Sequence, residues 1–192
     1  EFTPDYILLW IATDKIYEEF LEQDMVARSK FAELYIQKLE HYWTLITTKS
    51  KAKVIQLNFT EINDKVLGNY SCKVESTFCY QIRKLNYLLQ EAMSKNGNVY
   101  PVDLLSLQIQ LGTKELYYAP LYYNAKMCID MKALPYIAKA VIDVIKALTG
   151  RIKKCVVCDL DNTLWGGVIG DDGLGGIEIG ELGRGHACTN LQ

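Results

Sequence analysis

The sequence contains, towards its carboxyl end, the stretch Lys153-Lys-Cys-Val-Val-Cys-Asp-Leu-Asp-Asn-Thr-Leu-Trp-Gly-Gly167. Its short apolar run is too brief for a helix and predicts a buried strand of a parallel sheet. The run ends at Asp159, and a second carboxylate, Asp161, follows two positions later. Open parallel sheets place their chemistry beyond the carboxyl ends of their strands. Because two acids crowded there repel each other unless a cation or a shared proton intervenes, the pattern predicts phosphoryl chemistry assisted by Mg²⁺.

Other interpretations of this stretch are weaker. A calcium-binding loop that started at Asp159 would need Gly at its sixth position and Glu at its twelfth, but Leu164 and Gly170 stand there. A solvated Asx turn does not explain the buried strand predicted before it. Cys155 and Cys158 have the spacing of a redox pair, but residues three apart in a strand point to opposite faces. Two buried thiols are therefore the preferred interpretation of these cysteines.

Upstream of this stretch, strand and helix patterns alternate. Strands are predicted over 6–12, 53–59 and 99–103. A short helix, capped by Thr13 or Asp14, is predicted after the first strand. Further helices are predicted over 29–48, over 74–92, over a short segment ending near Gly112, and over 134–148. Such alternation predicts an α/β fold, three-layered and with a mainly parallel sheet. The Tyr-rich segment from Tyr117 to Asn124 contains Pro120 and is predicted to be a loop. The predicted domain boundary lies near Gly150, which separates residues 1–150 from residues 151–192.

The amino-acid composition limits the cellular compartment and the kinds of partner expected for this chain. The chain has 192 residues, 49% of them hydrophobic, and a formal net charge of −2, with Lys and Arg spread along its length. No basic cluster indicates nucleic-acid binding, and the longest apolar stretch, from Tyr6 to Ala12, is far too short to span a bilayer. The six cysteines do not form a disulfide framework, so we expect a reducing cytoplasm. We therefore expect neither nucleic acid nor a membrane as a partner.

The acidic stretch also carries a family resemblance. The segment Asp-Leu-Asp-Asn-Thr at residues 159–163 resembles the first motif of the haloacid dehalogenase (HAD) superfamily. The longer string from Lys154 through Trp165-Gly-Gly-Val-Ile-Gly-Asp-Asp-Gly-Leu174 resembles the FkbH-like branch of that superfamily. This resemblance implies that residues 1–150 form a domain similar to SGNH hydrolases, with an SGNH/flavodoxin-like sheet, and that residues 151–192 begin a HAD-type Rossmannoid domain with its first strand and flap hairpin.

The resemblance also implies roles for individual residues. Asp159 would be the nucleophile that forms an aspartyl-phosphate, and Asp161 would act as general acid and base. Both would bind Mg²⁺ through oxygen atoms. The phosphate loop would comprise Leu160, Asn162 and Thr163, with the Thr163 hydroxyl closing the turn, and a substrate-covering flap would start at Trp165, Gly166 and Gly167. A HAD start that no longer catalyses remains an alternative.

SGNH hydrolases use a Ser–His relay, which the amino-terminal region does not reproduce. The chain has two histidines, His41 inside a predicted helix and His186 after the acidic stretch. Without an imidazole beside a nucleophilic Ser, esterase activity of this region is not favoured. Asn58, at the end of a predicted strand, would line a binding site or simply form a turn, and the tyrosines at 117–123, with Lys126, would form a docking surface or pack as an ordinary loop.

The resemblance finally implies a reaction and partners. In the FkbH-like branch, a glyceryl group from 1,3-bisphosphoglycerate is loaded onto an acyl carrier protein with loss of phosphate, in secondary-metabolite assembly. The alternatives are a small-molecule HAD phosphatase and a non-catalytic module that binds a carrier protein or a sugar. Later HAD elements, a Ser or Thr, a Lys and a further acidic pair, do not occur before Gln192. We therefore expect this chain to be part of a larger enzyme and to lack turnover alone.

Overall fold

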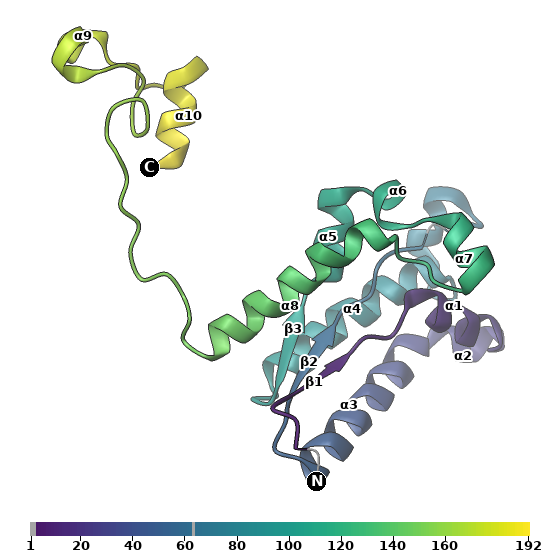
Figure 1. Cartoon of the computed structure of the whole chain (residues 1–192). Coiled ribbons are helices and arrows are strands. Elements are labelled where there is room, and N and C mark those ends of the chain that lie inside the picture. Colours follow the sequence, from purple (N-terminus) through teal and green to yellow (C-terminus); the bar gives the residue numbers. More distant parts are fainter. Residues whose placement is uncertain (1–2, 63) are drawn as a thin grey trace. The chain divides into compact units, whose positions relative to one another are not determined.

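The computed structural model describes residues 3–62 and 64–192 and divides the chain into two compact units. Unit 1 is Glu1–Gly150, and unit 2 is Arg151–Gln192 (Figure 1). Each unit is described by itself below. Among the described residues, no helix is both long and apolar enough to cross a membrane.

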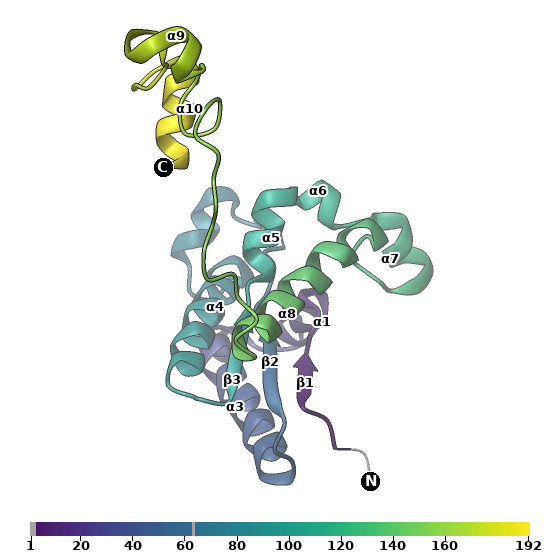
Figure 2. The ribbon, with the colours of Figure 1, turned by 60° about the vertical axis from the view of Figure 1, so that its left-hand side comes forward.

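A parallel three-stranded sheet forms the centre of unit 1. Its strands are β1 (Tyr6–Leu9), β2 (Lys53–Leu57) and β3 (Val99–Val102), and they lie side by side in the order β1-β2-β3 (Figure 2). In the register, Ile7 pairs with Val54, and Val54 pairs with Val99. Each strand therefore starts at the same edge of the sheet, and the segments that follow all three strands meet at the opposite edge.

Helices connect the strands of unit 1 and continue after the last of them. Between β1 and β2 lie α1 (Thr13–Leu21), α2 (Met25–Ser29) and α3 (Phe31–Lys49), and between β2 and β3 lie the 3₁₀ helix η1 (Gly68–Lys73) and α4 (Phe78–Ser94). After β3 come α5 (Leu104–Leu111), α6 (Thr113–Leu116), α7 (Ala119–Ala125), the 3₁₀ helix η2 (Met131–Ala133) and α8 (Leu134–Leu148). The sequence predicted the long helices correctly to within a few residues.

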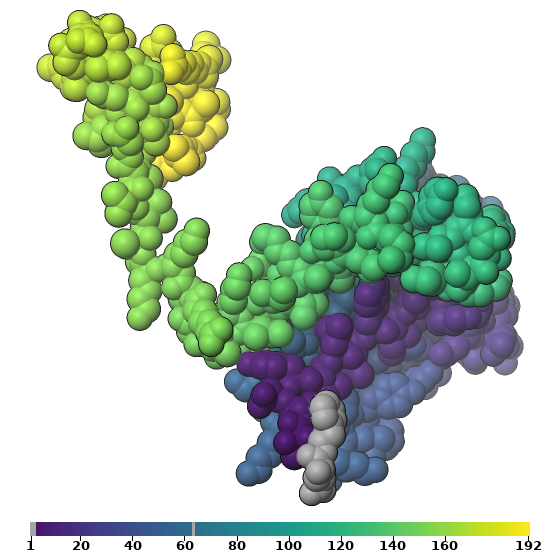
Figure 3. Space-filling view, viewed as in Figure 1, coloured from purple at the N-terminus to yellow at the C-terminus, as the bar shows by residue number. Residues whose placement is uncertain are grey.

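Two hydrophobic cores cover the two faces of this sheet. The larger core joins α1, α3 and α4 to one face, and Leu39, Leu85 and Val54 are fully buried in it. The smaller core joins α5 and α8 to the other face through Leu104 and Ile137. The space-filling view shows α8, in green, over this second face, with part of β1, in purple, still visible beside it (Figure 3). The predicted three-layer α/β fold with a parallel sheet is confirmed.

Unit 2 differs from its prediction. It contains α9 (Ile169–Gly176) and α10 (Gly183–Leu191), while residues 151–159 have no regular secondary structure. The predicted buried strand before Asp159 is therefore wrong for this structure, in which Val156 is 79% exposed and Val157 93% exposed. An apolar run becomes a parallel strand only when neighbouring strands pair with its backbone. Among the described residues, no strand does so here. The predicted HAD-type first strand thus stays an extended segment.

Turn and capping predictions had mixed outcomes. Gly150 follows α8 with φ +69°, as a left-handed residue after a helix end should. Thr13 and Asp14 do not cap α1, because the N-cap residue is Ala12 and no side chain caps this helix end. The segment at 117–124 is not a loop, since most of it forms α7. Pro120 is compatible with this helix because it occupies the first turn, where its missing N–H would have no partner in any case.

A buried glutamine ties three segments of the larger core together. The Gln81 Oε1 atom accepts the backbone N–H of Ala32, at 2.8 Å, and its Nε2 group donates to the carbonyls of Ser29, at 3.0 Å, and Glu75, at 2.6 Å. Gln81 is fully buried on α4. This one side chain therefore satisfies a buried backbone N–H at the start of α3 and two carbonyls, one before α3 and one before α4.

Replacing Gln81 should destabilise the protein through those backbone groups. We expect Gln81→Met to lower the free energy of unfolding by about 2–3 kcal/mol, because it leaves a buried N–H group and two carbonyls without partners. The matched control is Gln90→Met on the exposed side of the same helix, which should change stability by less than about 0.5 kcal/mol. Urea unfolding at constant slope measures both. Equal stability of the two variants would contradict this role of Gln81.

Candidate functional site

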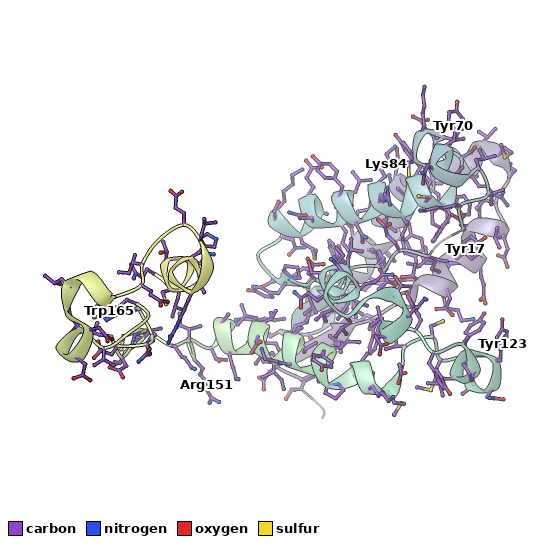
Figure 4. The ribbon with its side chains drawn as sticks, turned by 90° about the horizontal axis from the view of Figure 1, so that it is seen from above. Tyr17, Tyr70, Lys84, Tyr123, Arg151 and Trp165 are labelled. Carbon is purple, nitrogen blue, oxygen red and sulfur yellow. The ribbon has the colours of Figure 1, made fainter. Side chains whose placement is uncertain are left out.

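The two aspartates of the acidic stretch have different surroundings. Asp161 is half-buried, and its Oδ1 atom accepts the indole N–H of Trp165, at 3.0 Å, and the backbone N–H of Ile169, at 3.2 Å. Asp159 is exposed, and its Oδ1 atom accepts the backbone N–H of Leu160, at 2.8 Å. Asp161 is therefore engaged in the loop that follows it, whereas Asp159 faces solvent. Trp165 is labelled in Figure 4.

Asn162 closes the loop that Thr163 was predicted to close. It adopts a left-handed conformation, with φ +55°. Its Oδ1 atom accepts the backbone N–H of Gly167, at 3.1 Å, and a guanidinium N–H of Arg184, at 2.6 Å, and its backbone N–H donates to the Gly167 carbonyl, at 3.2 Å. In the described residues, Thr163 takes part through its backbone N–H, which donates to the Leu160 carbonyl, and not through its hydroxyl. The prediction for the Thr163 hydroxyl was wrong because an Asn side chain reaches both ends of the turn.

The predicted flap hairpin is replaced by a bridge and a helix. Gly166 and Glu178 exchange two backbone hydrogen bonds, of 3.0 and 2.8 Å, in an antiparallel bridge. Between them lies α9, whose start is held by Asp172, because its Oδ2 atom accepts the Val168 N–H at 2.8 Å. A carboxylate in the first turn of a helix can satisfy a free N–H group in this way. Gly173 then interrupts α9, with φ +64°.

The position of Arg184 depends on the close approach of α10 to the backbone of the residues before it. Gly185 is buried in α10, and a Cβ atom built there would lie 2.9 Å from the backbone of Gly180 and 2.9 Å from that of Ile179. Only glycine fits at this distance. The sequence analysis missed Arg184 and Gly185 because both lie some twenty residues after the motif and belong to no recognised pattern.

Asp159 and Asp161 of unit 2 were predicted to bind Mg²⁺. Carboxylate and carbonyl oxygens, which Asp159 and Asp161 provide, are the ligands that Mg²⁺ prefers. Their chemistry thus fits the ion. However, no group of three or more His, Cys, Asp or Glu side chains that could hold a metal occurs among the described residues, and one oxygen of Asp161 is occupied by Trp165. Binding of Mg²⁺ by Asp159 and Asp161 therefore stays a prediction.

Polar side chains also gather at the carboxyl edge of the sheet in unit 1. Asn58, directly after β2, donates to Asp103 Oδ1, at 2.7 Å, and accepts the backbone N–H of Leu105, at 3.1 Å. Burial acts to raise the pKa of Asp103, but hydrogen bonds from Ser106, Asn58 and the backbone outweigh it and lower that pKa. Asn58 therefore joins the ends of β2 and β3, which is a structural role.

A second polar group lies near the ends of β1 and β2. The buried hydroxyls of Thr13 and Thr60 are hydrogen-bonded at 2.9 Å, and Thr60 is also bonded to the Tyr117 hydroxyl. Burial raises the pKa of Tyr117 to about 12. Burial and the Asp14 carboxylate raise the pKa of the Cys128 thiol to about 12. Tyr117 is thus a half-buried hydrogen-bonding residue, not part of an exposed docking surface.

The remaining tyrosines of the predicted docking surface belong to α7 or flank it. Tyr118 and Tyr123 are exposed, and the rings of Tyr122 and Tyr123 pack edge to face, with centroids 5.8 Å apart. The Lys126 ammonium lies 4.8 Å from the centroid of the Tyr122 ring. These aromatic contacts occur within one helix and the residue that ends it. A docking role for them stays a prediction.

A cavity of about 480 Å³ opens beside the segments that follow β2 and β3. Its lining includes Glu61, Lys65, Cys79, Arg83 and Gln108. Gln108 is buried and holds the segment after β2, because it accepts the N–H of Glu61 and donates to its carbonyl. None of the residues predicted to act in catalysis lines this cavity. No sequence motif marks this cavity, because its walls come from four separate segments.

Comparison with known proteins gives a family and a solved structure. The family model described as FkbH, N-terminal domain, matches residues 1–146. A crystal structure of the N-terminal part of the protein BF1531 from Bacteroides fragilis, containing a phosphatase domain and complexed with Mg, is similar at 35% sequence identity with a TM-score of 0.88. The similarity covers 98% of this chain and 50% of that chain, so this chain spans half of its length. No match was found among curated proteins.

A side chain at position 185 should loosen the acidic loop. We expect Gly185→Ala to displace α10 and, with it, Arg184, because its Cβ atom would meet backbone atoms rather than a flexible side chain. The Gly167 amide and the Trp165 indole should then lose protection in hydrogen exchange measured by NMR. The control is Gly170→Ala, whose Cβ atom meets nothing within 4 Å. Unchanged protection in the Gly185→Ala variant would contradict this dependence.

The raised pKa of Cys128 predicts slow alkylation. With a pKa of about 12, only on the order of one thiol in ten thousand is a thiolate at pH 8. We therefore expect iodoacetamide to modify Cys128 at least about 100-fold more slowly than the exposed Cys155. Raising the pH through 10 should accelerate the reaction at Cys128, and unfolding in urea should make the two rates similar. Equal rates in the folded protein would contradict the raised pKa.

Proposed function

The chain belongs to the family of FkbH N-terminal domains, and from this premise we propose that it forms the first part of an FkbH-like HAD enzyme that transfers phosphoryl groups through Asp159. The observation that carries the proposal is the similarity to a protein part that contains a phosphatase domain. Because this similarity covers 98% of the chain, it extends beyond the 146 residues of the family match and into unit 2. The acidic stretch lies in unit 2.

The proposed chemistry starts from the exposed carboxylate of Asp159. One of its oxygens attacks phosphorus, which forms an acyl-phosphate on Asp159 and releases the leaving group. Asp161 donates a proton to the leaving oxygen and then accepts one from the water that hydrolyses the acyl-phosphate. Mg²⁺, held by oxygens of both residues, would neutralise negative charge on the phosphoryl group.

The loop after Asp159 supports these roles through its rigidity. Trp165 and Ile169 hold the Asp161 side chain, while Asn162 and Arg184 fix the turn. The N–H groups of Leu160, Asn162 and Thr163 are bonded within the chain in this structure, so phosphate oxygens bound here, as in other anion-binding turns, would take over those bonds. We propose that the extended residues before Asp159 pair with further strands when the remainder of the phosphatase domain is present. This pairing would bury Val156 and Val157 and aim Asp159 at the site.

We further propose the substrate and partner of this reaction. The substrate is 1,3-bisphosphoglycerate, whose glyceryl group passes to the thiol of an acyl carrier protein, and unit 1 assists the transfer by binding the carrier. The family resemblance of the acidic stretch supports this assignment. A small-molecule phosphatase, without a carrier, is the outcome to be distinguished by experiment.

The test uses a longer protein that continues this chain through its phosphatase domain. We expect Mg²⁺-dependent phosphate release that is lost with a chelator and falls by at least about 10³-fold in Asp159→Asn. Asp171→Asn is the matched control, because this exposed acid lies in α9 outside the proposed site and should leave the rate unchanged. Residues 1–192 alone should release no phosphate.

The carrier requirement separates the two functions. If a glyceryl group appears on the carrier thiol by mass spectrometry, and phosphate release depends on the carrier, the transfer reaction is supported. Release at the same rate without carrier would assign a plain phosphatase. Full activity of Asp159→Asn would overturn the proposed nucleophile in either case.

A further inference from the structure

Two cysteines of unit 1 meet although they belong to different elements. Cys72 lies in η1 and Cys79 in the first turn of α4, and their sulfur atoms are 3.6 Å apart. Figure 4 labels Tyr70 of η1 and Lys84 of α4, on the two elements that bring these sulfurs together. No other pair of cysteine sulfurs makes such a contact within residues 3–62 and 64–192.

The two thiols are unequally accessible. Cys72 is exposed, whereas Cys79 is only 5% exposed. Burial, followed by the hydrogen bond with Cys72, raises the pKa of Cys79. Cys72 is therefore the more exposed of the two residues, and its sulfur lies next to that of Cys79.

A guanidinium group lies next to the accessible sulfur. Arg83 donates an N–H to Cys72 Sγ at 3.3 Å, and two further N–H groups to both carboxylate oxygens of Glu61, at 2.8 and 2.7 Å. This bidentate ion pair fixes the direction of the guanidinium. The ion pair thus holds a guanidinium N–H against the Cys72 sulfur.

The segment between the cysteines is held in place. The Thr77 hydroxyl donates to the carbonyl of Ser71 at 2.6 Å and accepts the N–H of Tyr80, which caps α4. The Ser71 hydroxyl, which is buried, accepts the N–H of Leu67 at 3.1 Å. The sulfur contact is thus part of a hydrogen-bonded turn, and little chain movement is needed to join the sulfurs.

From this arrangement we propose that Cys72 and Cys79 form a modification site, at which a peroxide converts the two thiols into a reversible disulfide. In the first step the Cys72 thiolate attacks one oxygen of hydrogen peroxide, an S–O bond forms, the O–O bond breaks, and hydroxide leaves and takes up a proton as water. In the second step the Cys79 sulfur attacks the Cys72 sulfur, the S–O bond breaks, and the Cys79 proton leaves with the hydroxide as a second water. Two thiols are oxidised by two electrons, and one peroxide is reduced to two waters.

The disulfide would act on the cavity described above. Cys79, Arg83 and Glu61 line that cavity of about 480 Å³. A bond from Cys79 to Cys72 would tie η1 to α4 at the cavity wall and remove the thiol to which Arg83 donates. Oxidation would therefore change the shape of this cavity, and a dithiol would restore it.

Mass spectrometry can test the site directly, because Lys73 lies between the two cysteines. Trypsin cleaves after Lys73 and after Arg83, so a disulfide would join two separate peptides. The test uses residues 1–192 with the exposed Cys155 and Cys158 replaced by Ser. We expect stoichiometric peroxide to remove two thiols per chain, to yield the linked peptide pair, and to be reversed fully by dithiothreitol.

Single variants in the same background separate the two steps. Cys79→Ser should leave a sulfenic acid on Cys72 that dimedone traps, and Cys72→Ser should leave Cys79 unmodified at the same peroxide dose. Cys128→Ser, a control outside the pair, should still lose two thiols. Thermal unfolding followed by circular dichroism verifies that each variant is folded. Oxidation of Cys79 in Cys72→Ser, or the absence of linked peptides in the parent, would overturn the proposal.

Discussion

The burial of β2 on both faces is the constraint on which unit 1 depends. Val54, Ile55, Gln56 and Leu57 are all buried, because β2 lies between two strands and between two helical layers. The one polar residue among them, Gln56, accepts the indole N–H of Trp43 and donates to the carbonyls of Leu9 and Leu57. A buried amide is tolerated only when its partners are complete. Gln56 thus aligns α3 and β1 against the central strand and places the segments after β2 at the edge where the cavity opens.

Of two similar apolar runs in this chain, one forms a strand and the other does not. This difference shows which part of the fold can be predicted from the sequence. Residues 53–59 were predicted to form a strand, and the run before Asp159 a buried strand. The first is paired on both sides, while the second has no strand beside it among the described residues, and its valines are exposed. Periodicity identifies what a segment prefers, but pairing depends on neighbours that are distant in sequence. The helices were predictable because their hydrogen bonds are local.

The candidate site was likewise predictable from the sequence only in part. Asp159 and Asp161 were identifiable because two carboxylates after an apolar run have a direct chemical meaning. The groups that orient their loop, among them Asn162 and Arg184, follow from geometry that only the folded chain displays. The cavity near Arg83 and the thiol pair beside it were also hidden in the sequence, since Cys72 and Cys79 stand seven residues apart without a recognised motif. Their contact arises where a 3₁₀ helix meets the start of α4.

Because Trp165 is hydrogen-bonded to Asp161, tryptophan fluorescence can report on the acidic loop. Trp165 is the sole tryptophan of unit 2, since Trp10 and Trp43 lie in unit 1. Its indole N–H shares an oxygen of the carboxylate that the phosphoryl chemistry would require. Any cation or phosphoryl group that recruits this oxygen competes with the indole for it and alters the polarity around the ring. The protein thus carries an intrinsic fluorophore at its acidic loop, and emission from Trp165 would report occupancy there without an attached dye.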